Sequence, residues 1–287
     1  MSAIVTAYDR IDQTVVTLHR IADCEPPPAE ILVHVDGNQV ACADAVRKAF
    51  PAVKVLLSAQ RIGPGGGRNL LLAAATAPIV ASFDDDSYPI DRDYFARVRD
   101  VMRRFPHAAI VCARVYHQGE LLANASQQAS WVADFVGGGC VYRAAAVAAG
   151  PRYVPLVVAY GMEESDLALR LHARGERVLF TPWLRVFHDT DRARHADPAV
   201  TAASISNQAL LTFLRYPITL WPVGFMQSLN RVSWLLRNGR QRGVLRGLAN
   251  IPRRLWTYRA YRGPVSRRQL RSYHALRRRP VVAERES

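Results

Sequence analysis

The first ninety residues alternate between short apolar runs and longer segments in which apolar residues recur at helical spacing. Four runs have the length and composition of buried strands: Ala3–Ala7, Ile31–Val35, Val53–Ser58 and Pro78–Ser82. The segments between them are predicted to be helical over residues 12–22, 41–50 and 68–75. Parallel strands need such crossovers, so the pattern predicts an α/β fold with a mostly parallel, doubly wound sheet.

Three adjacent acids, Asp84-Asp85-Asp86, follow the fourth run through Phe83. Neighbouring carboxylates repel each other, so their burial requires positive charge beside them. Mg²⁺ and Mn²⁺ prefer clustered oxygen ligands, and open α/β sheets bind ligands at the carboxyl ends of their strands. The alternative is a solvated turn that caps the helix expected near Asp91-Arg92-Asp93.

A glycine-rich segment, Gly63–Gly67, is predicted to be a loop before a helix that starts at Arg68. Glycines allow close approach of the backbone to a phosphate, and a helix N-terminus favours anions. The spacing matches neither the dinucleotide fingerprint nor the P-loop. A phosphate-binding loop and a tight connection therefore both remain open for this segment.

The second half of the chain contains further polar groups beside predicted elements. Glu163-Glu164-Ser165-Asp166 opens a helix predicted to end at Arg174. Acids in a first turn are stabilised by the helix dipole, but a carboxylate at such a position can also act as a general base. His188 follows two short strand-like runs, Arg177–Phe180 and Leu184–Phe187, and is either a metal ligand or a structural residue.

The order of these segments resembles the family 2 glycosyltransferases of the GT-A fold, over roughly Ser2 to Asp189. The resemblance is carried by this series: Thr6–Arg10, Val35–Gly37, Gly66–Asn69, Asp84–Asp86, Gly137–Gly139, Glu163–Leu167, Leu169–Leu171 and His188. The later residues look like the helical extension of bacterial rhamnosyltransferase-type members, which is a much looser similarity. We therefore predict a GT-A domain over residues 1–200 and a helical extension over 201–287.

This resemblance implies transfer of a hexosyl or deoxyhexosyl group from a nucleoside diphosphate sugar to a hydroxyl, with Mn²⁺ or Mg²⁺ as cofactor. It implies nucleotide contacts by Thr6, Tyr8, Asp9, Asp36, Arg68, Asp84 and Asp85, metal ligation by Asp86 and His188, and acceptor space at Gly137, Gly138 and Gly139. Glu163-Glu164 matches the acid pair that supplies the catalytic base, usually its second member. Here the second acid is Glu rather than the commoner Asp, so either residue is a candidate. One displacement by an acceptor hydroxyl would invert the sugar.

Two other functions fit parts of this pattern. A nucleotidyltransferase-like enzyme is expected to carry a glycine-rich basic signature at its first strand, whereas Ala7-Tyr8-Asp9-Arg10 contains no glycine. A non-catalytic protein that binds a nucleotide sugar or an anionic surface is expected to have lost a carboxylate, and here all of them are present. The acceptor is predicted to be a glycan, a lipid-linked sugar or another envelope component.

The net charge of +14 belongs entirely to the end of the chain. Residues 1–230 contain 22 basic and 22 acidic side chains, whereas residues 231–287 contain 16 arginines and two glutamates. Arginines interleaved with aromatic residues suit anionic lipid headgroups or nucleic acid, and solvated helix faces are the third interpretation. A sugar transferase with a lipid-linked or envelope acceptor would benefit from surface attachment, which favours the membrane.

Compartment is predicted from three absences in the sequence. It shows no C-x-x-C pair, no basic leader and no apolar stretch long enough to span a bilayer. These absences predict a cytoplasmic protein, and the basic tail adds peripheral attachment to the inner face of the membrane as a second expectation.

Overall fold

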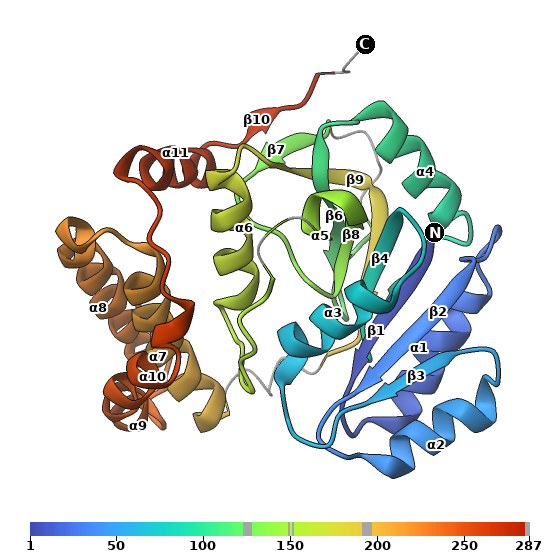
Figure 1. Ribbon diagram of the computed structural model, residues 1–287, viewed down its shortest axis with the longest axis horizontal. Helices are drawn as coiled ribbons and strands as arrows, with labels where there is room; N and C mark the ends of the chain where they lie inside the picture. Colours follow the sequence, from blue (N-terminus) through green and yellow to red (C-terminus); the bar gives the residue numbers. More distant parts are fainter. Residues whose placement is uncertain (123–127, 149, 151, 191–196, 285–287) are drawn as a thin grey trace.

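The computed structural model describes residues 1–122, 128–148, 150, 152–190 and 197–284 (Figure 1). Its centre is a mixed, mainly parallel sheet with strands in the order β10-β7-β9-β6-β8-β4-β1-β2-β3, and β5 pairs with β9 off this path. The strands are β1 Ser2–Ala7, β2 Glu30–Val35, β3 Lys54–Leu57, β4 Ile79–Asp84, β5 Ser87–Pro89, β6 Ala108–Tyr116, β7 Ser130–Val132, β8 Gly139–Arg143, β9 Arg177–His188 and β10 Val281–Val282. The predicted α/β class is confirmed.

The N-terminal half of the sheet is parallel, as the alternating pattern predicts. Strands β3, β2, β1 and β4 run in one direction, and they are connected by α1 Ile11–Ala22, α2 Val40–Ala49 and α3 Gly63–Ala74. The register pairs Thr6 of β1 with both His34 and Asp84. The polar segments that follow these strands therefore meet at one edge of the sheet.

The glycine-rich segment differs from its prediction, because Gly63–Gly67 forms the first turns of α3 and not a loop before it. Asp36 at the end of β2 accepts hydrogen bonds from the backbone N–H groups of Ile62 (2.8 Å) and Gly63 (3.0 Å). These contacts satisfy backbone donors that a helix start leaves unpaired. A side chain distant in sequence thus starts the helix where low intrinsic propensity predicted a loop.

The second half of the sheet is mixed. Strand β8 lies antiparallel between β4 and β6, and β9 runs parallel to β6. The two short strands predicted at the end of this region are one strand, β9, because pairing with β6 resumes after an irregularity. Ala113 pairs with Thr181, but Arg114 pairs with Arg185, so residues 182–184 are extra on β9.

The two faces of the sheet carry separate apolar cores, and β1 shows the division. Val5 joins the core on one face with α1, α2 and α4 (Tyr94–Arg104), whereas Ile4 joins the other with α3 and α6 (Glu163–Ala173). The short helix α5 (Ala144–Ala148) follows β8. This alternation is the two-residue period of a strand that is buried on both faces.

The C-terminal helices lie on the opposite side of the molecule from β2 and β3 (Figure 1). They are α7 Pro198–Arg215, α8 Trp221–Arg237, α9 Val244–Ala249, α10 Ile251–Thr257 and α11 Arg267–Arg278. Helices α8, α9 and α10 pack on α7, while α11 packs on α6 and leads to β10 at the edge of the sheet. The division predicted between residues 200 and 201 lies inside the first turn of α7. None of the helices in the described ranges is long and apolar enough to cross a membrane.

Candidate functional site

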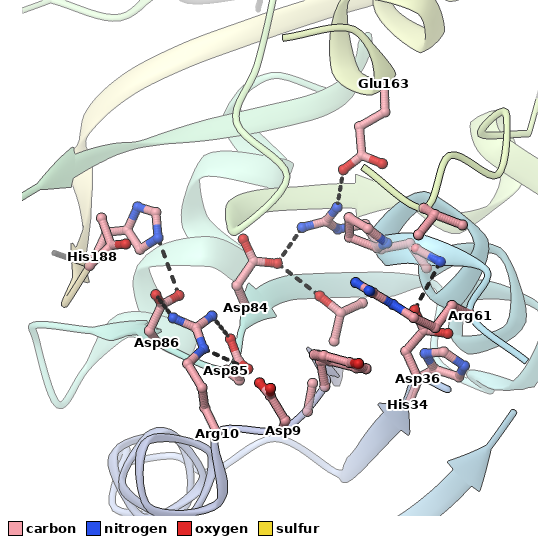
Figure 2. A pocket seen from close by; sticks show the side chains of 18 of the residues that line it. Asp9, Arg10, His34, Asp36, Arg61, Asp84, Asp85, Asp86, Glu163 and His188 are labelled. Carbon is pink, nitrogen blue, oxygen red and sulfur yellow. Dashed lines mark hydrogen bonds and ion pairs between the residues drawn. The ribbon is translucent and has the colours of Figure 1, made fainter. Parts of the chain in front are cut away.

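A cavity of about 420 Å³ opens at the carboxyl ends of β1, β2 and β4 (Figure 2). Eleven of the residues predicted for the site line it: Thr6, Tyr8, Asp9, Asp36, Arg68, Asp84, Asp85, Asp86, Glu163, Glu164 and His188. The cavity is also lined by Arg10, His34 and Arg61, which the sequence did not single out as site residues. The need for positive charge beside the acid triplet was the signal that pointed to a residue such as Arg10.

Arg10 supplies the positive charge beside two of the three acids. Its Nε donates a hydrogen bond to Asp85 Oδ2 at 3.1 Å, and its two terminal nitrogens form ion pairs with Asp85 and Asp86. Burial raises the pKa of Asp85 to about 7, although the charge of Arg10 opposes this shift. Burial acts in the same direction on Asp86, but the hydrogen bond from His188 and the charge of Arg10 lower the pKa of Asp86 to about 2.

Arg68 connects the acid triplet to the acid pair. Its side chain is 1% exposed, and it donates to Glu163 Oε1 at 2.7 Å and to Asp84 Oδ1 at 2.5 Å. Asp84 Oδ1 also accepts a hydrogen bond from the hydroxyl of Thr6 at 2.8 Å. The guanidinium therefore holds two carboxylates from distant parts of the chain at a fixed separation (Figure 2).

The two members of the acid pair have different surroundings. Glu163 is ion-paired to Arg68 and packs against Gly65, where a Cβ atom would lie 2.6 Å from its Oε2. Glu164 accepts a long hydrogen bond, 3.3 Å, from the backbone N–H of Gly137. Burial raises the pKa of both glutamates above the ordinary range.

At the end of the cavity where the nucleobase is predicted to bind, several side chains already contact one another. Asp36 is buried and, besides capping α3, accepts a hydrogen bond from Ser58 Oγ at 3.1 Å. Arg61 lies over the ring of Tyr8, with 4.2 Å between its Cζ and the ring centroid. Asp9 is exposed beside them. The structure thus places these predicted residues together at one end of the cavity.

The three glycines predicted for the acceptor lie behind the cavity and do not line it. A Cβ atom at Gly137 would lie 2.6 Å from Arg68 Cζ, and one at Gly138 would lie 2.3 Å from Asp84 Oδ2. Gly139 begins β8. Close packing against the charged groups thus accounts for glycine at positions 137 and 138.

A second cavity, of about 580 Å³, adjoins the first at the acid pair. Both cavities are lined by Glu163 and Glu164, together with Arg61, Pro64 and Val157. The second one extends along residues 157–161 to the start of α7. The acid pair therefore stands between two spaces, one at the strand ends and one beside the C-terminal helices.

The donor groups around Asp86 suit a divalent cation by their chemistry. Asp86 Oδ1 lies 3.2 Å from His188 Nε2, and carboxylate oxygen with imidazole nitrogen is a set that Mn²⁺ accepts. In the ranges that the structure describes, no three such ligands converge on one point. Arg10 lies on Asp85 and Asp86 at the position where a cation would compensate their charge.

The fold is that of the GT-A glycosyltransferases. The chain matches the family model Glycosyl transferase family 2 over residues 2–148, and it belongs to this family. The prediction from motif order is thereby confirmed, while the closer resemblance to rhamnosyltransferase-type members stays a prediction. No curated protein matches the chain by sequence.

Solved structures show the same fold at low sequence identity. A mannosyltransferase from Pyrobaculum calidifontis, PcManGT in complex with GDP-Man and Mn²⁺, aligns with TM-score 0.60 and 16% identity over 96% of this chain and 83% of that one. GalNAc-T7 with UDP, GalNAc and Mn²⁺ aligns with TM-score 0.59 and 12% identity over 76% of this chain and 48% of that one. S. aureus TarS gives TM-score 0.54 and 13% identity over 81% and 48%. The chain thus spans about half the length of GalNAc-T7 and TarS.

Proposed function

We propose that this protein transfers a hexosyl or deoxyhexosyl group from a nucleoside diphosphate sugar to an acceptor hydroxyl, with inversion at the sugar. The observation that carries the proposal is the position of Glu164, which lines both cavities, the first of them together with the acid triplet. Family membership and the nucleotides and Mn²⁺ of two structural neighbours support the donor class.

The donor is assigned to the cavity at the strand ends. Tyr8, Asp9 and Asp36 are proposed to contact the nucleoside, where Arg61 already lies over the Tyr8 ring. Asp86 and His188 would hold Mn²⁺ or Mg²⁺, which neutralises charge on the departing diphosphate when bound. Asp84, which is ion-paired to Arg68, is proposed to lie toward the ribose.

Glu164 is the better candidate for the general base. Glu163 is held through its Oε1 in an ion pair with a buried arginine. Glu164 accepts a long hydrogen bond, 3.3 Å, from the backbone N–H of Gly137, and it lines both cavities. Burial raises the pKa of both glutamates toward neutral pH, where a general base is most effective, so the contacts and not the pKa distinguish the two.

The acceptor is assigned to the second cavity. Its position beside Glu164 allows an acceptor hydroxyl to reach the carboxylate from the face opposite the diphosphate, which is the geometry of a single inverting displacement. Gly137 and Gly138 are proposed to shape the back wall of the donor space, since they pack on Arg68 and Asp84. A glycan or a lipid-linked sugar is the acceptor class that we propose.

A thermal-shift screen of UDP-, GDP- and dTDP-sugars, each with and without Mn²⁺, tests the donor assignment. A ligand at 100 times its Kd stabilises the folded protein by about 2.7 kcal/mol, so one donor family is expected to raise Tm, and only with metal. NMR of the released sugar product then reports the anomeric configuration. Stabilisation by no sugar nucleotide, or release of pyrophosphate instead of a nucleoside diphosphate, would contradict the proposal.

A further inference from the structure

The C-terminal helices expose an unusual number of large apolar side chains. The exposed ones from α8 to α10 are Trp221, Val223, Phe225, Met226, Leu229, Trp234, Leu236, Leu245, Leu248 and Trp256. Three of them, Trp221, Phe225 and Leu229, recur every four residues and form one stripe along α8. A water-facing helix normally carries polar side chains at such positions.

This stripe borders an apolar groove of about 370 Å³. Helix α8 forms one wall, Leu248, Ile251 and Leu255 of α9 and α10 form the other, and α7 forms the floor. The two hydroxyl groups in the groove, of Thr212 and Ser228, donate to backbone carbonyls of their own helices at 3.2 and 3.0 Å. The groove therefore offers hydrocarbon contact and few polar groups for a hydrogen-bonding ligand.

Each tryptophan of this region lies beside an arginine. The guanidinium carbon of Arg262 is 5.4 Å from the Trp221 ring, that of Arg231 is 4.9 Å from Trp234, and that of Arg259 is 3.9 Å from Trp256. Tryptophan is enriched at membrane–water interfaces, and arginine keeps its charge in the headgroup layer while its stem contacts apolar surface.

Arg262 lies directly at the groove. Its guanidinium carbon is also 5.0 Å from the ring of Phe213, which lines the groove. Among the described residues its buried Nη1 has no hydrogen-bond partner. Arg262 therefore places a guanidinium beside the apolar side chains of the groove.

The charge of this region selects an anionic occupant. Residues 198–283 contain 16 arginines and not one Asp or Glu. A second copy would bring the same positive charge onto itself, and like charges oppose such pairing. Nucleic acid would satisfy the arginines but would leave the apolar stripe in water.

We infer that the face formed by the α8 stripe, the groove and the three tryptophan–arginine pairs docks the protein on an anionic phospholipid bilayer. The apolar side chains enter the boundary between headgroups and acyl chains, and the arginines bind lipid phosphates. The protein lies on the membrane in this arrangement and does not span it. This inference is independent of the proposed chemistry.

The docking face and the acceptor cavity share α7. Val200 lines the second cavity and Ala209 lines the groove, so the two are about 14 Å apart along the helix axis at 1.5 Å per residue. A bilayer at the groove therefore lies within reach of a sugar whose lipid anchor remains in the membrane. Access to a lipid-linked sugar rests on the proposed function, whereas the docking face does not.

Part of the basic tail is excluded from this face. Tyr273 is buried and its hydroxyl donates to Asp134, and Arg277 is 3.0 Å from the same carboxylate. Both therefore attach α11 to the GT-A domain. The sequence suggested that all the basic and aromatic residues of the tail act together, but the structure assigns these two to internal contacts.

Vesicle binding tests the inference with the full chain. The wild type is expected to bind vesicles of phosphatidylglycerol and phosphatidylcholine, but not phosphatidylcholine alone, and brominated lipid is expected to quench its tryptophan fluorescence. The double variant Phe225→Ser, Leu229→Ser is expected to lose about tenfold or more in partition coefficient, because two apolar side chains no longer enter the bilayer.

Two matched controls separate this face from general effects. Leu70→Ser changes an equally exposed leucine on α3, 44% against 45% for Leu229, and is expected to bind normally. A triple variant of the docking face is expected to bind vesicles about tenfold more weakly or worse. It carries Gln in place of Arg231, Arg259 and Arg262. The same change at the surface arginines Arg47, Arg92 and Arg103 removes equal charge and is expected to have a small effect.

Three results would overturn the inference. The first is an absence of binding to anionic vesicles, and the second is equal loss in the two sets of arginine variants. The third is a dimer that dissociates in the Phe225→Ser, Leu229→Ser variant, which would assign the face to a second copy. Glu164→Gln is expected to bind vesicles like the wild type. The vesicle experiment therefore tests the docking face even if the proposed chemistry is wrong.

Discussion

Arginine has opposite surroundings in the two regions of this molecule. At the strand-end site Arg10 and Arg68 each contact two carboxylates, and residues 1–230 have no net charge. Residues 198–283, which contain the C-terminal helices, include no acids, and four of their arginines, Arg231, Arg254, Arg259 and Arg262, lie over aromatic rings. The first arrangement fixes buried groups in place, and the second leaves charge available for an external anion. Whether an arginine positions a site or recruits a partner therefore depends on the acids that the chain supplies beside it.

The largest expected effect is on catalysis at the acid pair. Glu164→Gln is expected to lower kcat by about 10²–10⁴, because a general base contributes that much. Glu163→Gln is expected to act mainly on stability, since it removes the partner of Arg68. Steady-state rates and thermal unfolding of both variants check this. Full activity in Glu164→Gln would transfer the base role to its neighbour or reject it.

Removing a buried arginine is expected to lower the free energy of unfolding more than removing an exposed arginine from an ion pair of similar length. Arg68→Met leaves two carboxylates without their partner and is expected to destabilise the fold by about 3–5 kcal/mol. Arg92→Met breaks an ion pair of 2.6 Å whose side chains are 72% and 74% exposed, and is expected to cost about 0–1 kcal/mol. Urea unfolding measures both. Equal effects would mean that Arg68 does not hold the site together.

Arg10 is expected to compete with a divalent cation for the acid triplet. Arg10→Gln removes the guanidinium from Asp85 and Asp86 and is expected to tighten Mn²⁺ binding by about tenfold, which corresponds to about 1.4 kcal/mol. Electron paramagnetic resonance of free Mn²⁺ gives the Kd without any turnover. Arg61→Gln, which removes the same charge from the ring of Tyr8, serves as control. Unchanged or weaker binding in Arg10→Gln would argue that the arginine helps to form the metal site.

The pH dependence of transfer reports the burial of the acid pair. Burial raises the pKa of Glu164, and a general base works only when ionised. Activity is therefore expected to fall as pH decreases through this raised pKa, so the acid limb of kcat/KM lies above the ordinary glutamate value of about 4.3. A limb at or below that value would show that Glu164 is solvated or is not the base.

The smallest expected effects are those of salt concentration. We compare its effect on vesicle binding by the docking face with its effect on the stability of the strand-end site. Exposed charges are screened over a Debye length of about 8 Å at physiological ionic strength, whereas buried pairs are screened much less. Raising the salt concentration is therefore expected to weaken vesicle binding several-fold and to change the stability contributed by Arg68 little. Binding to vesicles that is insensitive to salt would show that the apolar stripe acts without the arginines.

Much of the N-terminal half was predictable because its signals are local. The strands β1, β2 and β4 follow from short apolar runs, and the parallel order follows from the helices between them. The strand-end residues then had to meet, as they do around the cavity. By contrast, β5, β7 and β10 have only two or three residues each and depend on partners far away in sequence. Their formation is decided by pairing, which a local pattern does not contain.

The sequence by itself determined the fold class and the family, and it singled out eleven residues that line one cavity, because motif order and strand ends are readable along one dimension. Only the tertiary structure decided which arginine partners which acid, that Gly63–Gly67 starts a helix capped by Asp36, and that Glu164 stands between two cavities. It also decided which part of the basic tail is attached to the GT-A domain and which part faces outward. The physical reason is that ion pairing, capping and burial act between groups brought together by folding, and their separation along the chain carries no information about that distance.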